Sequence, residues 1–341
     1  MDRSYVNNHS SIKGLIVQTF DFHQDTPDVD TTLAKCICHL ASGKLVALPT
    51  ETVYGLAGDA TNGIAVARIF EVKQRPQFNP LIAHVSGLEM AKTIGKFDET
   101  SIRLAKAFWP GPLTLVVAKV PTTNIHDLVT AGLETIAIRC PGGSAHQLIA
   151  AYGSPLAAPS ANRSGRLSPT SAKHVVAEFP GEDIIVLDGG DCDVGIESTI
   201  ATVQNGEVVI LRAGSVTIEQ LADASGLEVT TVEANSKITA PGMLASHYAP
   251  RAEVVLECKS KLPDAAMLAI GPDCEGELNL SVSGDLKEAA ANLYRQLRQL
   301  DGLGLATICV APIPHEGLGI AINDRLSRAA APRSTDGNAN E

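Results

Sequence analysis

Residues 45–60, LVALPTETVYGLAGDA, place a short apolar run directly before a loop rich in hydroxyl groups. The run Leu45–Leu48 predicts a buried strand, which ends at Pro49 because proline cannot donate a hydrogen bond to a neighbouring strand. In α/β proteins the residues that follow such strands gather at one edge of the sheet, where ligands bind. The loop 49–55 is therefore a candidate active-site loop, although threonine and glycine are equally common in ordinary turns.

Helices and strands alternate on both sides of this stretch. Apolar residues at helical spacing predict helices over residues 29–40, 64–72, 101–108, 145–152 and 171–178. Short apolar runs predict further strands over residues 81–85, 113–120, 135–140, 184–187 and 197–203. Asn205-Gly206 separates the last of these from the apolar run 208–211, a spacing typical of a two-residue hairpin. The sequence therefore predicts an α/β fold whose sheet is mixed.

The pattern changes after residue 217. A helix is expected over 218–224, after which the periodicity fades as far as residue 251. Further strands are then expected at 254–256, 265–270 and 305–310, with helices over 285–300 and 318–330. We therefore expect a first α/β domain over 22–217, a linker over 218–250, a smaller α/β domain over 251–330 and a disordered tail over 331–341.

Net charge, cysteine content and hydropathy argue against several classes of protein. The chain of 341 residues carries a net charge of −11, which argues against a protein that coats nucleic acid, because such binding neutralises phosphates with Lys and Arg. The seven Cys are scattered and form no CxxC pair, so we expect reduced thiols and a cytoplasmic location. The polar N-terminus does not resemble a secretory signal, and no apolar run is long enough to span a membrane.

Four cations stand at the ends of predicted elements of the first domain. Lys73 and Arg75 follow a helix, whereas Arg139 and Arg212 each end a strand. Taken singly, they are explained by the helix dipole or by the start of solvent exposure. Taken together, they predict a convergent pocket for a phosphate, a carboxylate or both.

A second polar cluster, PSANRSG over residues 159–165, follows a predicted strand and precedes a helix. Hydroxyls and backbone N–H groups at such a position bind anions, and Ser168 or Thr170 is also expected to cap the helix. The chain contains no GxxxxGK[ST], GxGxxG, GxSxG or HExxH motif, which excludes several common classes of enzyme.

These segments resemble the Sua5/YciO/YrdC family in sequence and in order. The matching stretches of the first domain are LPTETVYGLAGDA (48–60), KQRPQFNPLIAHV (73–85), WPGPLTLVV (109–117), TIAIRCPGG (135–143), PLAAPSANRSGRLSPT (155–170), GIESTI (195–200) and ILRAGS (210–215). PGMLASHYAPRA (241–252) and GLGIAINDRLSRAA (317–330) resemble the extension of the two-domain Sua5 members. The resemblance implies a YrdC-like twisted mixed sheet with flanking helices, followed by a Rossmann-like Sua5 domain.

The resemblance also implies a nucleotidyltransferase reaction. L-threonine, bicarbonate and ATP would give threonylcarbamoyl-AMP and pyrophosphate, with Mg²⁺ accompanying the ATP and no residue assigned to bind the metal. The product would pass to a separate transferase that completes N6-threonylcarbamoyladenosine at position 37 of tRNA, so direct tRNA binding would be weak or absent.

The family's functional residues carry over to positions of this chain. Catalysis would fall on Lys73 and Arg75, and Tyr248 of the linker would close over the nucleotide as part of a lid. The implied ATP contacts are Arg75, Asn79, Thr135, Asn162, Thr170, Arg212 and Tyr248. The implied threonine contacts are Thr52, His84, Arg139, Ser160 and Ser198, with the Arg139 guanidinium paired to the threonine carboxylate. Cys140 and Ala213 depart from the residues expected beside Arg139 and Arg212.

Two other functions remain open at the level of sequence. The cation cluster on a concave sheet could grip the phosphates of double-stranded RNA, against which the acidic balance of residues 1–217 (17 Lys+Arg, 21 Asp+Glu) speaks. A carbamoyltransferase of the hydrogenase-maturation type would share the fold, but the chain has no room or cysteine spacing for that family's additional segments.

Overall fold

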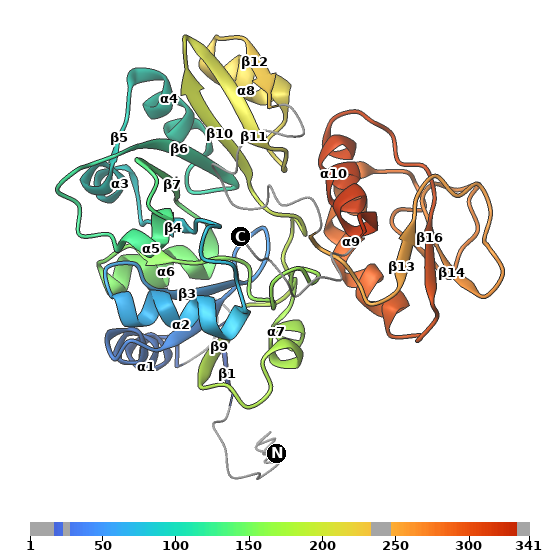
Figure 1. The fold of residues 1–341 in the computed structure, drawn as a ribbon, viewed down its shortest axis with the longest axis horizontal. Helices are drawn as coiled ribbons and strands as arrows, with labels where there is room; N and C mark the ends of the chain where they lie inside the picture. Colours follow the sequence, from blue (N-terminus) through green and yellow to red (C-terminus); the bar gives the residue numbers. More distant parts are fainter. Residues whose placement is uncertain (1–16, 23–27, 233–246, 333–341) are drawn as a thin grey trace, which may run out of the picture.

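The computed structural model describes residues 17–22, 28–232 and 247–332. Part of the predicted linker, 233–246, and the predicted tail from residue 333 onward lie outside the described residues. Two α/β domains lie side by side, the second smaller than the first (Figure 1).

A single mixed sheet forms the centre of the first domain. Its strand order is β1-β9-β2-β3-β8-β4-β7-β6-β10-β11-β12, with β5 paired to β6. The strands are β1 (Gln18–Asp21), β2 (Leu45–Leu48), β3 (Gly55–Asp59), β4 (Ile82–His84), β5 (Gly95–Lys96), β6 (Leu113–Lys119), β7 (Thr135–Arg139), β8 (Leu156–Ala157), β9 (Ile184–Asp188), β10 (Thr199–Gln204), β11 (Glu207–Arg212) and β12 (Val229–Thr231). Strand β7 pairs in parallel with β4 and antiparallel with β6, which confirms the predicted mixed sheet.

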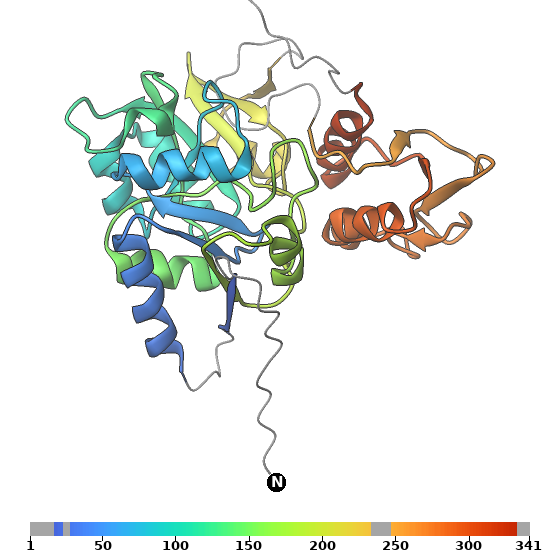
Figure 2. The ribbon, with the colours of Figure 1, turned by 60° about the horizontal axis from the view of Figure 1, so that its bottom comes forward.

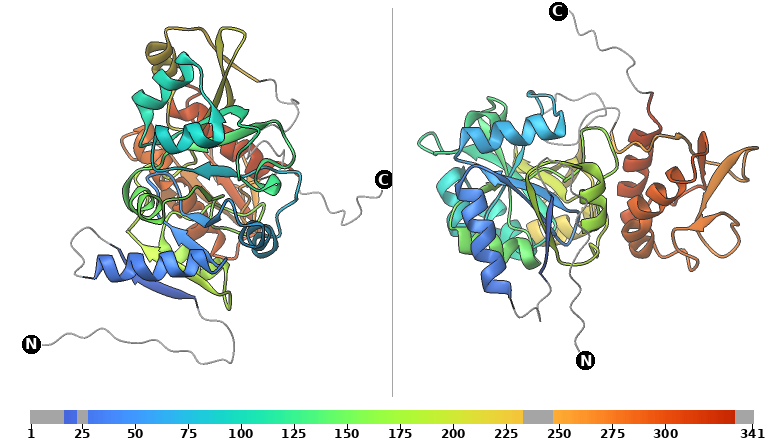
Figure 3. Two further views of the ribbon diagram at one scale, coloured as in Figure 1. Left: turned by 90° about the vertical axis from the view of Figure 1, so that its left-hand side faces the viewer. Right: turned by 90° about the horizontal axis from the view of Figure 1, so that it is seen from below.

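Helices flank this sheet and supply most of its apolar cover. They are α1 (Val29–Ala41), α2 (Gly63–Lys73), α3 (Leu88–Ile94), α4 (Glu99–Phe108), α5 (Asp127–Thr130), α6 (Gly143–Tyr152), α7 (Ala172–Glu178) and α8 (Ile218–Ser225). Helix α1 packs on α6 on the side of the domain away from the second domain (Figure 3). Burial of apolar side chains is the main favourable term in such packing.

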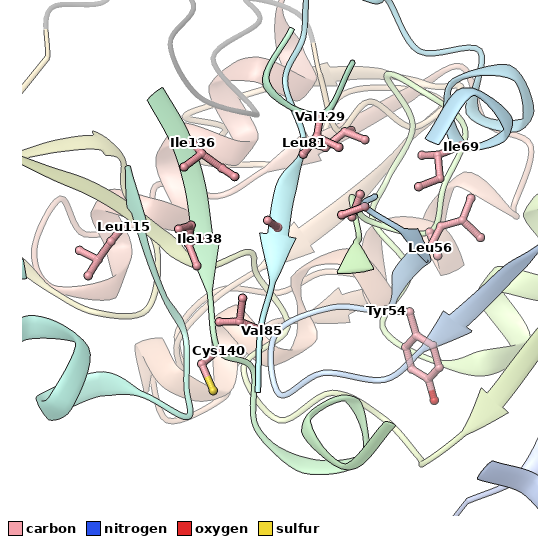
Figure 4. Packing of buried hydrophobic residues seen from close by; sticks show 14 of the residues in the cluster. Tyr54, Leu56, Ile69, Leu81, Val85, Leu115, Val129, Ile136, Ile138 and Cys140 are labelled. Carbon is pink, nitrogen blue, oxygen red and sulfur yellow. The ribbon is translucent and has the colours of Figure 1, made fainter. Parts of the chain in front are cut away.

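The largest buried cluster joins residues that are far apart in the sequence. Ile69 of α2, Leu115 of β6 and Ile138 of β7 all belong to it (Figure 4). Cys140, which follows β7, packs in the same cluster, so its thiol replaces an apolar side chain there. This packing holds the ends of α2 and β7, and therefore Arg75 and Arg139, in fixed relative positions.

The hairpin predicted around Asn205-Gly206 is present. Strands β10 and β11 pair antiparallel from Gln204↔Glu207 to Ile200↔Arg212, with one irregularity near residue 200. Both turn residues have positive φ, 53° at Asn205 and 81° at Gly206, as a tight two-residue turn requires. The pairing places Arg212 at the end of the hairpin opposite the turn, next to the residues that precede β10.

The first part of the predicted linker, residues 218–231, belongs to the first domain. Strand β12 pairs in parallel with β11, and helix α8 packs against α4. Residues 218–231 therefore extend the first sheet, whereas the expectation placed them in the connection between domains.

The second domain is a small parallel sheet with helices on the side that faces the first domain. The strands are β13 (Glu253–Val255), β14 (Ala265–Ala269), β15 (Leu278–Asn279) and β16 (Thr307–Val310), in the order β13-β16-β14-β15. Helices α9 (Leu286–Asp301) and α10 (Leu318–Ala330) lie between this sheet and the first domain (Figures 1 and 2). No helix within the described ranges is long and apolar enough to cross a membrane.

Candidate active site

A pocket lies over β4, where the first domain meets residues 247–248. The parallel pairing of β4 with β7 brings His84 and Arg139 to the same sheet edge. Seven of the residues implied by the family resemblance line it: Arg75, His84, Arg139, Ser160, Ser198, Arg212 and Tyr248. The cations that converge on this pocket suit a phosphorylated ligand.

The three arginines of the pocket are buried side chains. Arg75, Arg139 and Arg212 are 9%, 4% and 6% exposed, respectively. The phosphate backbone of a nucleic-acid duplex cannot reach guanidinium groups in this position, since it needs cations on an open surface. The RNA-binding alternative therefore loses its structural basis.

Arg75 is directed by the end of helix α2. The helix stops at Lys73, and Gln74 takes the left-handed conformation (φ 53°) that turns the chain. The Arg75 Nε and Nη2 atoms then donate to the carbonyl oxygens of Asn79 and Pro80, at 3.1 and 2.7 Å. The guanidinium thus secures the loop that enters β4 while it lines the pocket.

Lys73 lies in the wall behind the pocket. Its Nζ donates to the carbonyl oxygen of Ser160 at 2.5 Å and to that of Asn162. The Asn162 amide in turn donates to the carbonyls of Arg163 and Arg166. Lys73 and Asn162 therefore hold the loop that carries Ser160, and neither belongs to the lining of the pocket.

Arg139 is already paired with a carboxylate. Its Nη2 donates to Glu51 Oε1 at 2.5 Å, and its Nε donates to the Gly111 carbonyl at 3.1 Å. The other Glu51 oxygen accepts from the Gly142 backbone N–H. Burial would raise the pKa of Glu51, but Arg139 and the Gly142 N–H outweigh it and lower the pKa. Arg139 can bind an anionic ligand here with Glu51 as a fixed neighbour.

Ser198 and Arg212 are hydrogen-bonded to each other at the end of the β10–β11 hairpin opposite its turn. Arg212 Nη2 donates to the Ser198 carbonyl at 2.9 Å and lies 3.3 Å from its hydroxyl. The same hydroxyl lies 2.8 Å from Thr114 Oγ1 on β6. The register of the hairpin brings these residues together.

Two further predicted threonine contacts are His84, which lines the pocket, and Thr52. His84 is buried, and burial followed by the Arg139 charge lowers its pKa to about 3, so the ring is neutral. Thr52 does not itself line the pocket, but its hydroxyl lies 2.8 Å from that of Thr50, which does. The loop 49–55 is thus part of the site, as the sequence predicts.

His247 and Tyr248 close one side of the pocket. Tyr248 is buried and takes a left-handed backbone conformation, φ 59°, which is unfavourable for a bulky residue. Its ring lies 4.1 Å from that of His247 and 5.8 Å from that of Tyr294 on α9. Tyr248 also belongs to a buried cluster that contains Val53 of the first domain, so packing from both domains holds the strained residue.

Besides Asn162, three predicted ATP contacts do not line the pocket. Thr135 begins β7 and is ~13 Å from Arg139 at the other end of the strand. Thr170 accompanies His174, whose Nδ1 accepts from the Thr170 N–H at 3.2 Å. Asn79 is buried close behind the wall, and its side-chain oxygen and nitrogen have no hydrogen-bond partner. Only Asn79 of these three carries unsatisfied polar atoms that suit a ligand.

The prediction that Ser168 or Thr170 caps helix α7 is wrong. The N-cap residue is Ser171, which makes no side-chain capping bond. The Ser168 hydroxyl instead donates to Glu197 Oε1 at 2.5 Å. A buried carboxylate is a stronger acceptor partner for the hydroxyl than the orphan N–H groups of a short helix.

Comparison with known proteins agrees with this geometry. Residues 38–214 match the Sua5–YciO–YrdC family, described as "Telomere recombination", and residues 216–331 match "Threonylcarbamoyl-AMP synthase, C-terminal domain". The chain belongs to the Sua5/YciO/YrdC family. A Sua5-family relative from Pyrococcus abyssi, named threonylcarbamoyl-AMP synthase, is 39% identical, with 86% of this chain and 92% of the relative aligned. Another relative of that name, from Bacillus subtilis, is 37% identical, with 89% of this chain and 94% of the relative aligned.

A solved Sua5 structure shares the whole architecture. The crystal structure of P. abyssi Sua5 complexed with L-threonine superposes with a TM-score of 0.82 at 34% identity, covering 92% of this chain and 97% of that one. The two-domain layout of this family member is therefore that of Sua5.

Sequence reasoning missed three residues of this Sua5-type site. Glu51 and Glu197 stand inside quoted motifs, yet a lone carboxylate next to predicted anion-binding residues gave no reason to single it out. His247 lies in the segment where periodicity fades. Only the packing of distant segments reveals that Glu197 and His247 line the pocket.

Proposed function

We propose that the protein joins L-threonine, bicarbonate and ATP into threonylcarbamoyl-AMP and releases pyrophosphate. The observation that carries the proposal is the convergence of Arg75, Arg139 and Arg212 on one pocket that also presents hydroxyls of Ser160 and Ser198. Relatives named threonylcarbamoyl-AMP synthase, aligned over most of both chains, support the same activity.

The pocket suits a reaction between two anions. Carboxylation of the threonine amine gives a carbamate, which loses CO₂ readily in water and needs a closed site. Arg139 would bind the threonine carboxylate, beside the Glu51 carboxylate that already holds one edge of its guanidinium. The neutral ring of His84 next to it leaves the amine side of the amino acid without a further positive charge.

The nucleotide would occupy the side of the pocket lined by Arg75 and Arg212. These guanidinium groups are preorganised by bonds to main-chain carbonyls, so they can neutralise a triphosphate without rearranging. Charge on the phosphoryl group and on the departing pyrophosphate would be spread over them in the transition state. The Lys73 side chain would act through the loop that it holds.

Magnesium would arrive with the nucleotide as MgATP. Among the described residues no group of three or more His, Cys, Asp or Glu side chains could hold a metal ion. The Glu197 carboxylate of the lining and the Glu51 carboxylate paired with Arg139 are both engaged by protein donors. The phosphate oxygens of the substrate would therefore provide most of the ion's ligands.

The product would be handed to a separate tRNA-modifying transferase, in keeping with the buried position of the cations. We also propose a cytoplasmic location, in which the seven free cysteines would stay reduced.

The decisive experiment measures pyrophosphate release from MgATP by the purified protein. Release is expected only when threonine and bicarbonate are both present, with threonylcarbamoyl-AMP identified by mass spectrometry. Release that is indifferent to threonine would contradict the proposal. Salt-sensitive binding of duplex RNA without ATP turnover would favour the alternative function instead.

A further inference from the structure

The C-terminal domain reaches the pocket through a buried carboxylate. Glu197 lines the pocket and accepts from Tyr294 Oη on α9, at 3.0 and 3.3 Å, and from Arg325 Nε on α10, at 2.8 Å. The Ser168 hydroxyl is its remaining donor from the first domain. Arg325 is 1% exposed, so this ion pair is shielded from water.

Arg325 also contacts two other segments near the pocket, at Ala213 and at Tyr248. Its Nη2 donates to the carbonyl of Ala213, the residue after Arg212, at 2.9 Å. Its guanidinium lies 5.3 Å from the centre of the Tyr248 ring. One side chain of the second domain thus touches three segments that build the site.

Glu197 has a competing partner within the pocket. Arg212 is bonded to the backbone of Ser198, the next residue after Glu197, so the carboxylate and the Arg212 guanidinium lie in the same wall. Burial would raise the Glu197 pKa, but Arg325 and then Arg212 bring it down to about 2, so the carboxylate is charged. A buried carboxylate without Arg325 would need another cation.

We propose that Arg325 and Tyr294 are positioning residues: they hold the Glu197 carboxylate, and so keep Arg212 in its place beside Ser198 on the pocket wall. Without them, Glu197 would draw Arg212 toward itself, and the site would lose a cation that faces the triphosphate. The C-terminal domain thereby sets the charge that the nucleotide meets, although it does not line the pocket with Arg325 itself.

The test is a double-mutant cycle in the full-length protein. We expect Arg325→Met to raise the KM for MgATP about tenfold, because it releases a charged carboxylate next to Arg212. Glu197→Gln added to Arg325→Met is expected to return this KM to within about threefold of wild type, because the amide no longer attracts Arg212. The KM for threonine should change less than that for MgATP in both variants.

The rescue separates a positioning role from a structural one. If Arg325 only stabilised the contact between the domains, the variant with both substitutions would have a KM for MgATP as high as that of Arg325→Met or higher. The proposal would then fail. Arg295→Met is the matched control, since Arg295 is exposed on α9, next to Tyr294, and its guanidinium donates to Asn292. Its KM for MgATP is expected to equal that of wild type.

Two further measurements cover an Arg325 variant that does not fold and a wild type that makes no product. Should Arg325→Met not fold, Tyr294→Phe removes only one hydroxyl donor to Glu197, and it must raise the KM for MgATP for the proposal to stand. The inference rests on the proposed function for its kinetic readout. If wild type makes no threonylcarbamoyl-AMP, that function fails, and titration of the same variants with ATP tests the inference by itself.

Discussion

At the scale of single residues, the pocket depends on the shape of guanidinium groups as much as on their charge. Arg75 donates to two carbonyls of the loop 79–80 with two different nitrogens. A lysine carries the same charge on a single nitrogen and cannot bridge both carbonyls while facing a phosphate.

Arg75→Lys is therefore expected to lower kcat/KM for MgATP at least tenfold, which corresponds to ~1.4 kcal/mol or more of transition-state stabilisation. The measurement is steady-state pyrophosphate release at saturating threonine and bicarbonate. Arg68→Lys is the control, because Arg68 lies in α2, the helix that precedes Arg75, and its ion pairs with Glu71 and Glu182 are partly exposed. Equal losses in the two variants would contradict this role of Arg75.

Buried histidines predict how stability depends on pH. The pKa of His84 and that of His247 are lowered to about 3, by burial first and by neighbouring arginines second, and that of His174 is lowered to about 4. In the unfolded chain each ring titrates near ~6.5. Below that pH the unfolded state binds protons that the folded state does not, so the free energy of unfolding decreases as pH falls from about 6.5 toward these folded values.

We therefore expect the melting temperature to be several degrees lower at about pH 5 than at about pH 7.5. His174→Asn should flatten this dependence, since an amide oxygen can accept from the Thr170 N–H in place of Nδ1 and does not titrate. Scanning calorimetry of both proteins across this range is the check. Parallel curves for wild type and variant would show that His174 is protonated in the folded state.

Sequence analysis predicted the meeting of two site residues correctly because each stands at the end of a strand. Arg139 and Arg212 end strands of one sheet, so their convergence follows from topology. The role of Lys73 could not be foreseen, because the carbonyls that it binds belong to a loop 87 residues away. Whether a cation faces a ligand or the protein depends on such distant acceptors.

At the scale of elements, strong hydrophobic periodicity predicted helices and strands well, whereas short strands without it could not be predicted. The hairpin of β10 and β11 has both a turn signal and two apolar strands. Strand β3, in contrast, reads GLAGD, with two glycines and no β-branched residue. It is a strand because it lies between β2 and β8, and sequence propensity does not report this context.

The hairpin turn is a place where stability and activity should separate. Gly206 has φ 81° and open space around the position of a Cβ atom. Gly206→Ala is expected to destabilise the protein by about 1 kcal/mol through backbone strain alone. Because Ser198 and Arg212 lie at the other end of the hairpin, kcat/KM should remain as in wild type. Urea unfolding measures the loss of stability, and steady-state kinetics measure the activity. A loss of kcat/KM in Gly206→Ala would mean that the turn affects the geometry of the pocket.

At the scale of the whole molecule, the two domains meet at a close backbone contact. A Cβ atom at Gly195 would lie 2.5 Å from the Ala290 carbonyl oxygen and from the Ala291 Cα atom on α9. Gly195 stands two residues before Glu197, so this contact and the ion pair to Arg325 belong to one interface. The sequence showed the glycine within a family motif, but only the docking of α9 explains why no side chain fits there.

Gly195→Ala should therefore push α9 away from the first domain and disturb the donors to Glu197. We expect a lower melting temperature and a raised KM for MgATP, since backbone atoms at 2.5 Å cannot yield as a flexible side chain would. Gly226→Ala is the matched control: its φ of 68° is close to the 76° of Gly195, but nothing lies within 4 Å of its Cβ position. Backbone strain is then similar in both variants, and only Gly195→Ala moves the domains. If both variants lost stability equally and bound MgATP as wild type does, the domain contact would have no part in shaping the pocket.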